Sequence, residues 1–153
     1  MFTGLVAVNV WMLRDSLVNG PLWYSDYGMA GMAYGGQQVF GAAADVLREE
    51  PGTQVLVSPT WANGVDVLRR FFIPDDAPVT ISNADSYLIG KHDLTDQMVF
   101  ALTPEEYDRV KTSPLIADIR VDRTIPYPDG RTGFYFVRMR YSPEADALLA
   151  QKA

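Results

Sequence analysis

The chain has 153 residues, of which 48% are hydrophobic and 21% are charged, and its net charge at pH 7 is −6. This length accommodates one complete hydrophobic core and is too short for two ordinary domains. The acidic balance argues against a nucleic-acid surface, which needs clustered Lys and Arg. The sequence contains no cysteine, which excludes disulfides, thiolate metal sites and cysteine nucleophiles.

The first residues form an apolar run, Phe2 to Leu13, that ends at Arg14 and Asp15. A helix that crosses a bilayer needs roughly 20 apolar residues, so this run is too short to cross alone. Two interpretations remain open: a buried segment of a soluble fold, or the last turns of a transmembrane helix that begins upstream. Trp11, close to the polar end, fits an interfacial anchor. Because the run has no polar face, we expect a helix that the rest of the protein does not fully cover.

A break at Asn19-Gly20-Pro21 divides the chain into an apolar N-terminal segment, residues 1–22, and an α/β domain, residues 23–153. Just after the break, small and apolar residues recur at helical spacing. They predict a helix over Tyr27–Glu49, with Asp26 as its N-cap.

Short apolar strands then alternate with helices, which is typical of a parallel sheet covered on both faces. Thr103 as N-cap and Glu106 three residues later predict a capping box. Two alternating segments joined around Pro128-Asp129-Gly130 predict an antiparallel hairpin. The predicted fold class is therefore α/β: a three-layer, Rossmann-like domain with a mostly parallel sheet and a C-terminal antiparallel hairpin, preceded by an apolar helical segment. We expect strands at 53–58, 78–82, 97–102, 117–125 and 133–141, and helices at 63–72, 103–111 and 142–151.

Two polar loops, Ser58–Gly64 and Ser82–Tyr87, follow neighbouring predicted strands. The carboxyl ends of parallel strands meet at one edge of a sheet, where α/β folds bind ligands. The start of a helix there favours an anion, and Trp61 offers a stacking plane. Helix capping and a core tryptophan explain the same residues, and this alternative stays open. The candidate ligand-binding residues are Ser58, Thr60, Trp61, Asn63, Asn83 and Asp85.

Other signals of chemistry are weak. The glycines between positions 28 and 36 match neither a dinucleotide loop nor a P-loop, and close helix packing explains them better. His92 is the only histidine, and no nucleophile elbow accompanies it. Asp85, Asp93 and Asp96 lack the spacing of a calcium loop. The sequence therefore predicts no catalytic residue, no metal site and no cofactor.

The stretch NGPLWYSDYGMAGMAYGGQQVF, residues 19–40, is followed by VLVSPTWANGVDVLRRFF, residues 55–72. Together they resemble the C-terminal portion of bacterial membrane glycosyltransferases of the protein-mannosyltransferase-like superfamily. The resemblance extends from about Val10 to about Tyr141. Such enzymes span the membrane many times and take a sugar from a polyprenyl-phosphate carrier. Several carry a soluble α/β domain after the last transmembrane helix, outside the cytoplasm.

The resemblance implies that the apolar run is the end of a transmembrane helix and that Trp23, Tyr24 and Tyr27 lie at the membrane–water interface. The catalytic acidic residues of such enzymes lie near the start of the membrane region, so none is transferred to this chain. The expected function is a non-catalytic, extracytoplasmic accessory domain of a lipid-linked-sugar glycosyltransferase. It would contact the membrane through residues 1–22 and help to position a glycan acceptor or the headgroup of a polyprenyl-phosphate sugar. Two alternatives stay open: a free-standing α/β module that binds a small anionic ligand, and a membrane-tethered interaction module.

Overall fold

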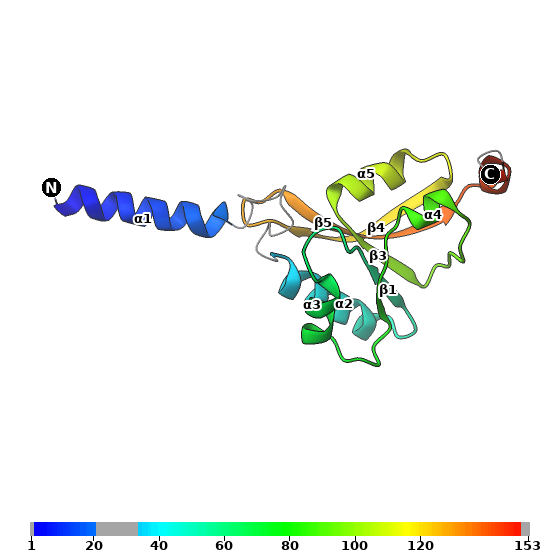
Figure 1. Cartoon of the computed structure of the whole chain (residues 1–153), viewed down its shortest axis with the longest axis horizontal. Coiled ribbons are helices and arrows are strands. Elements are labelled where there is room, and N and C mark those ends of the chain that lie inside the picture. The colour runs from blue at the N-terminus through cyan, green and yellow to red at the C-terminus, as the bar shows by residue number, and fades with distance from the viewer. Residues whose placement is uncertain (1, 21–33, 151–153) are drawn as a thin grey trace.

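Five strands form one mixed sheet in the order β2-β1-β3-β5-β4, and helix α1 stands apart from it (Figure 1). The structure is a computed structural model that describes residues 2–20 and 34–150. The strands are β1 (Gln54–Val57), β2 (Val79–Ile81), β3 (Met98–Leu102), β4 (Ile116–Pro126) and β5 (Thr132–Tyr141). The helices are α1 (Phe2–Val18), α2 (Gly36–Glu49), α3 (Val65–Phe72), α4 (Ser86–Ile89), α5 (Pro104–Thr112) and α6 (Ala145–Ala150).

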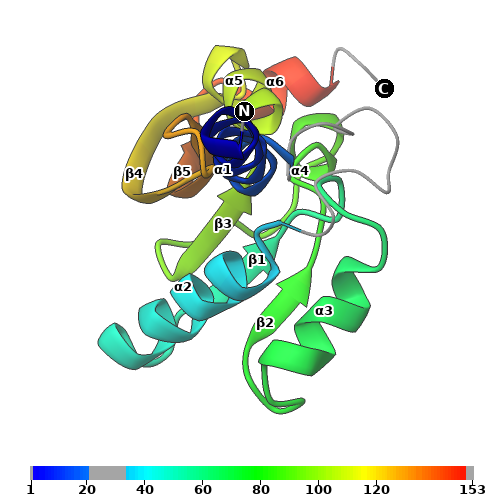
Figure 2. The same cartoon turned by 90° about the vertical axis from the view of Figure 1, so that its left-hand side faces the viewer.

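The sheet has a parallel half and an antiparallel half that meet at β3. Strand β1 pairs in parallel with both β2 and β3, and Figure 2 shows these three strands pointing the same way. Strand β5 runs antiparallel to β3 and also to β4, its hairpin partner. The prediction of an α/β fold with a parallel core and a closing antiparallel hairpin is confirmed.

Apolar side chains project from both faces of the sheet, so helices pack on each face. Val55 and Val57 of β1 point into one cluster with Phe40 of α2 and Val65 of α3. Leu56, between them, points into the other cluster, to which α4 and α5 contribute. Every residue of β3 is buried, as expected of a strand with neighbours on both edges and helices on both faces.

The start of α5 is as predicted. Thr103 Oγ1 accepts a hydrogen bond from the backbone N–H of Glu106, and Glu106 Oε2 accepts one from the backbone N–H of Thr103. Pro104 occupies the first turn, where its missing N–H leaves no bond unmade. This reciprocal arrangement is the predicted capping box, and it fixes where the chain leaves β3.

The helix predicted over Tyr27–Glu49 begins later than expected. Tyr34 and Gly35 form a turn and α2 starts at Gly36, so the prediction is wrong at these two positions. The backbone of Gly35 has φ 106°, in the left-handed region that interrupts a helix. The predicted N-cap Asp26 and the start at Tyr27 lie outside the described residues.

Three further helices differ from the expectation, and one of them is the terminal helix expected at residues 142–151, which begins at Ala145. The helix expected at residues 63–72 begins at Val65, with Gly64 at its N-cap. Helix α4 was not predicted, because four residues are too few to show a helical period.

Helix α1 forms as predicted, and none of its residues is buried. Figure 1 shows it extending away from the α/β part of the molecule. Within the described parts of the chain, no helix combines the length and the apolar character that crossing a membrane requires.

Gly35→Ala should destabilise the fold more than Gly52→Ala. Both glycines have positive φ, 106° and 95°, so an alanine costs roughly 1–2 kcal/mol at either position. At Gly35 an added Cβ would also come within 2.7 Å of the Phe134 ring, whereas at Gly52 nothing lies within 4 Å. Overpacking of this kind typically costs about 1–3 kcal/mol more. Denaturant unfolding of the two variants measures the difference, and equal losses would show that the Phe134 ring moves aside freely.

Candidate functional site

The carboxyl edge of the parallel strands was the predicted ligand site. Ser58 follows β1 there, and its side chain is fully buried. Its Oγ donates a hydrogen bond to Glu106 Oε1 at 2.7 Å and lies 2.9 Å from Thr60 Oγ1. The backbone N–H of Thr60 donates back to the same Oγ. The structure thus brings Ser58 and Thr60 together, around a carboxyl group that sequence reasoning assigned only to helix capping.

Glu106 occupies the space between β1 and the start of α5, and only 1% of it is exposed. One of its carboxyl oxygens accepts the Ser58 bond, and the other accepts bonds from Thr103 N at 3.0 Å and Thr103 Oγ1 at 3.3 Å. Each oxygen therefore has a partner inside the protein, as a buried carboxyl requires. This network fills the edge between β1 and β3.

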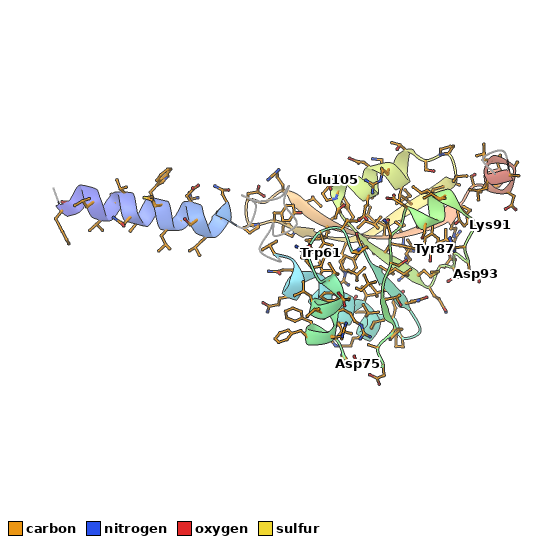
Figure 3. All side chains as sticks on the ribbon, in the orientation of Figure 1. Trp61, Asp75, Tyr87, Lys91, Asp93 and Glu105 are labelled. Atoms are coloured by element: carbon orange, nitrogen blue, oxygen red, sulfur yellow. The ribbon has the colours of Figure 1, made fainter. Side chains whose placement is uncertain are left out.

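The Trp61 side chain is partly buried and packs against the core cluster that contains Phe40 and Phe134 (Figure 3). Its ring meets Phe134 edge-on, with centroids 5.3 Å apart, and lies 6.4 Å from the Phe40 ring. The indole Nε1 is buried and has no hydrogen-bond partner among the described residues. This packing is what the core-tryptophan alternative expects, and the stacking role of Trp61 stays a prediction.

Asn63 is exposed, lies one residue before the N-cap Gly64, and makes no capping hydrogen bond. Asn83 and Asp85 belong to a separate cluster at α4. Asn83 Oδ1 accepts a hydrogen bond from the backbone N–H of Asp85, and the Asp85 carboxylate takes two bonds from Arg109, at 3.0 and 2.9 Å. These bonds raise the pKa of Arg109. No hydrogen bond in the described part of the chain joins this cluster to Ser58.

The loop around His92 lies at the surface. Lys91 pairs with Asp146, and the exposed His92 ring lies 5.2 Å from the Tyr87 ring (Figure 3). Within residues 2–20 and 34–150, no group of three or more histidine and carboxylate side chains is placed to hold a metal ion. The Lys91–Asp146 pair joins this loop to α6, and the Tyr141 hydroxyl of β5 donates to the Tyr87 carbonyl of α4.

A groove of about 300 Å³ opens on the hairpin, beyond the end of α2. One of its lining residues is Arg138, whose side chain is 12% exposed. The guanidinium donates to Asp122 Oδ2 at 2.7 Å, to Glu50 Oε2 and to the backbone carbonyl of Asp96. Burial opposes the charge, but the bonds to Asp122 and Glu50 outweigh it and raise the pKa of Arg138. The groove is lined by Glu50, Asp96, Asp118, Arg120, Arg138, Met139 and Arg140.

The other arginines of the groove are paired in the same way. Arg140 bonds both carboxylate oxygens of Asp96, at 2.7 and 2.6 Å, and Arg120 Nε donates to Asp122 Oδ1 at 2.7 Å. The opposite charges therefore compensate one another across the uncovered end of the sheet. Sequence reasoning did not find this network, because its partners lie as far as 88 residues apart. The local signal was the alternation of arginines along β5.

Helix α1 presents the largest uncovered apolar surface in the described chain. The polar side chain of Asn9 forms a hydrogen bond within the helix, because its Nδ2 donates to the Leu5 carbonyl at 2.7 Å. The polar end of the helix is closed by a 2.7 Å bond from Asn19 Nδ2 to Asp15 Oδ1. The exposed large apolar residues of α1 are Phe2, Leu5, Val6, Val8, Val10, Trp11, Met12, Leu13 and Leu17.

Comparison of the chain with protein-family models, curated proteins and solved structures finds no match.

Ser58→Ala should destabilise the domain by about 1–3 kcal/mol, because it removes a buried hydrogen bond and leaves Glu106 Oε1 without its donor. Thr60→Ala is the matched control: Thr60 is exposed, and its hydroxyl bonds only to Ser58 among the described residues. We expect it to cost less than about 1 kcal/mol in the same denaturant experiment. Equal effects of the two substitutions would contradict the assigned network.

Asp122→Asn should lower stability by about 1 kcal/mol near neutral pH, and the loss should shrink in acid. Burial raises the pKa of the Asp122 carboxyl, but the hydrogen bonds from Arg120 and Arg138 outweigh it and hold that pKa below its ordinary value. A lowered folded-state pKa stabilises the protein above the unfolded-state value, about pH 4, and this contribution disappears as the pH falls through the folded-state pKa. Unfolding free energies between pH 7 and pH 2.5 measure it. A pH-independent difference between variant and wild type would refute the linkage.

Proposed function

We propose that this chain is a non-catalytic accessory domain tethered to a membrane, in which α1 enters the lipid bilayer and holds the α/β part at its surface. The observation that carries the proposal is α1 itself: its large apolar side chains lie on every side of the helix, and none of its residues is buried. A helix that is apolar all round is stable only inside a large core or in lipid. Each large apolar side chain that leaves water contributes roughly 1.5–3 kcal/mol.

The polar end of α1 supports placing the α/β part on the water side. Arg14 and Asp15 begin the last turn of the helix, next to the connection to the domain. Trp11 comes just before them and is 64% exposed, which suits the interfacial position of an anchoring indole.

The sequence that follows α1 favours the extracytoplasmic side. Residues 15–47 contain no Lys or Arg. Segments next to membrane helices on the cytoplasmic side carry an excess of these residues, so their absence favours translocation. This agrees with the resemblance to lipid-linked-sugar glycosyltransferases, on which the identity of the parent enzyme rests.

A non-catalytic role is consistent with the hydrogen bonding at the carboxyl edge of the parallel strands. The Ser58–Glu106 network fills the position between β1 and β3 where a doubly wound domain binds its ligand. The strand order β2-β1-β3, with helices on both faces, supports relating the domain to three-layer, Rossmann-like folds. We infer that the domain contributes a surface that helps to position a glycan acceptor or a polyprenyl-phosphate headgroup.

Flotation with phosphatidylcholine vesicles tests the tether. We expect the full chain to float with the vesicles, and a variant lacking residues 2–18 to stay in solution with cooperative unfolding intact. The double variant Val8→Arg/Val10→Arg should also lose binding, because charged residues in lipid are costly. Val121→Arg is the matched control, since it places an arginine on an exposed position of β4.

Two results would overturn the proposal. Vesicle binding by the truncated chain would show that α1 is not the tether. Loss of folding on truncation would show that α1 belongs to the core of the protein.

A further inference from the structure

Helix α3 carries a second uncovered apolar face. Val67 and Phe71, one turn apart, are 61% and 79% exposed, and the partly exposed Phe72 meets Phe71 edge-on with centroids 4.9 Å apart. Val65 and Leu68 of the same helix pack against the core cluster to which α2 contributes. The apolar surface of α3 therefore extends from its core-facing side around the helix to the solvent.

The α3 face (Val67, Phe71 and Phe72) is held rigidly. Arg69 points inward from α3, and its guanidinium donates to the carbonyl oxygens of Pro74, Ala77 and Val79. These bonds fix the end of the helix to the loop that leads into β2. A fixed apolar face loses little conformational entropy on docking.

The rim of the α3 face is electrically balanced. Asp66 and Arg70, on the solvent side of α3, form an ion pair at 2.7 Å. The two charges of this ion pair cancel, so the α3 face can contact an uncharged partner surface as well as a charged one.

The position of the α3 face relative to α1 indicates its occupant. Gly36, the first residue of α2, lies against the α3 face: a Cβ built there would be 3.2 Å from the Phe72 ring. Residues 21–33 join α1 to this point of the domain in the sequence. The α3 face thus lies beside the point at which the domain is attached to its tether. A short tether raises the effective concentration of a second contact to the millimolar range, so a weak contact suffices.

We propose that the α3 face is a second membrane contact, which docks on the interfacial region of the bilayer that receives α1. The inference rests on the proposed function and deepens it, because two contacts restrict the rotation of the domain about its tether. Aromatic side chains are favoured at the boundary between headgroups and acyl chains, where Phe71 would lie. The α3 face supplements α1 and does not hold the domain alone.

Fluorescent labelling of the full chain tests the contact. Because the sequence lacks cysteine, single variants Phe71→Cys, Ile89→Cys and Leu5→Cys each give one labelling position for an environment-sensitive probe. Ile89, on α4, is the matched control, with 78% of its surface exposed against 79% for Phe71. Phosphatidylcholine vesicles should raise the emission intensity severalfold at positions 5 and 71 and shift the emission there to shorter wavelength. The emission at position 89 should not change. Spin-labelled lipids should quench positions 5 and 71 only.

The possible outcomes separate the two proposals. A response at position 5 without one at position 71 would leave the tether intact and overturn the α3 contact. Silence at both positions would overturn both. A change at position 71 that depends on protein concentration without vesicles would show that a second copy of the chain covers the α3 face. A probe at position 71 that is already blue-shifted in buffer, at any concentration, would show that the chain itself covers it.

Discussion

One buried carboxyl group, that of Glu106, determines what the carboxyl edge of the parallel strands can do. It accepts hydrogen bonds from Ser58 after β1 and from Thr103 after β3, so it joins the ends of two neighbouring strands to the start of α5. Removing the Ser58 hydroxyl leaves Glu106 Oε1 unsatisfied, which is costly in an apolar surrounding, whereas Oε2 has two donors on Thr103. The position that binds ligands in many α/β folds is here part of the internal structure.

The same network directs the chain that follows. With Ser58 held at the edge, the loop turns Trp61 inward against Phe134 of the hairpin, and Phe134 in turn leaves room only for a glycine at position 35. These contacts join the parallel half of the sheet to the antiparallel half. Farther along the hairpin, Arg138 of β5 forms ion pairs with Glu50, which follows α2, and with Asp122 of β4. The polar side chains of Ser58, Glu106 and Arg138 thus bond to partners within the domain.

Sequence reasoning succeeded where the signal is local. The cap of α5 and the strand β3 follow from residues a few positions apart, and both were predicted. The start of α2 was missed because the glycine at position 35 answers to a contact with the Phe134 ring, which is distant in sequence. The sequence could not decide between a stacking and a core role for Trp61, because its neighbours are set by the tertiary fold. The network around Arg138 joins residues that no spacing rule relates.

These constraints bear on how the domain would lie at a membrane. Its net charge of −6 disfavours general attraction to an anionic bilayer, so electrostatics alone would not bring the sheet edges or the hairpin down onto lipid. Apolar contact at α1 and at the α3 face would then decide the orientation. Both surfaces consist of apolar side chains carried on helices. The resulting orientation should persist at high ionic strength, because screening weakens charge pairs and leaves apolar burial intact.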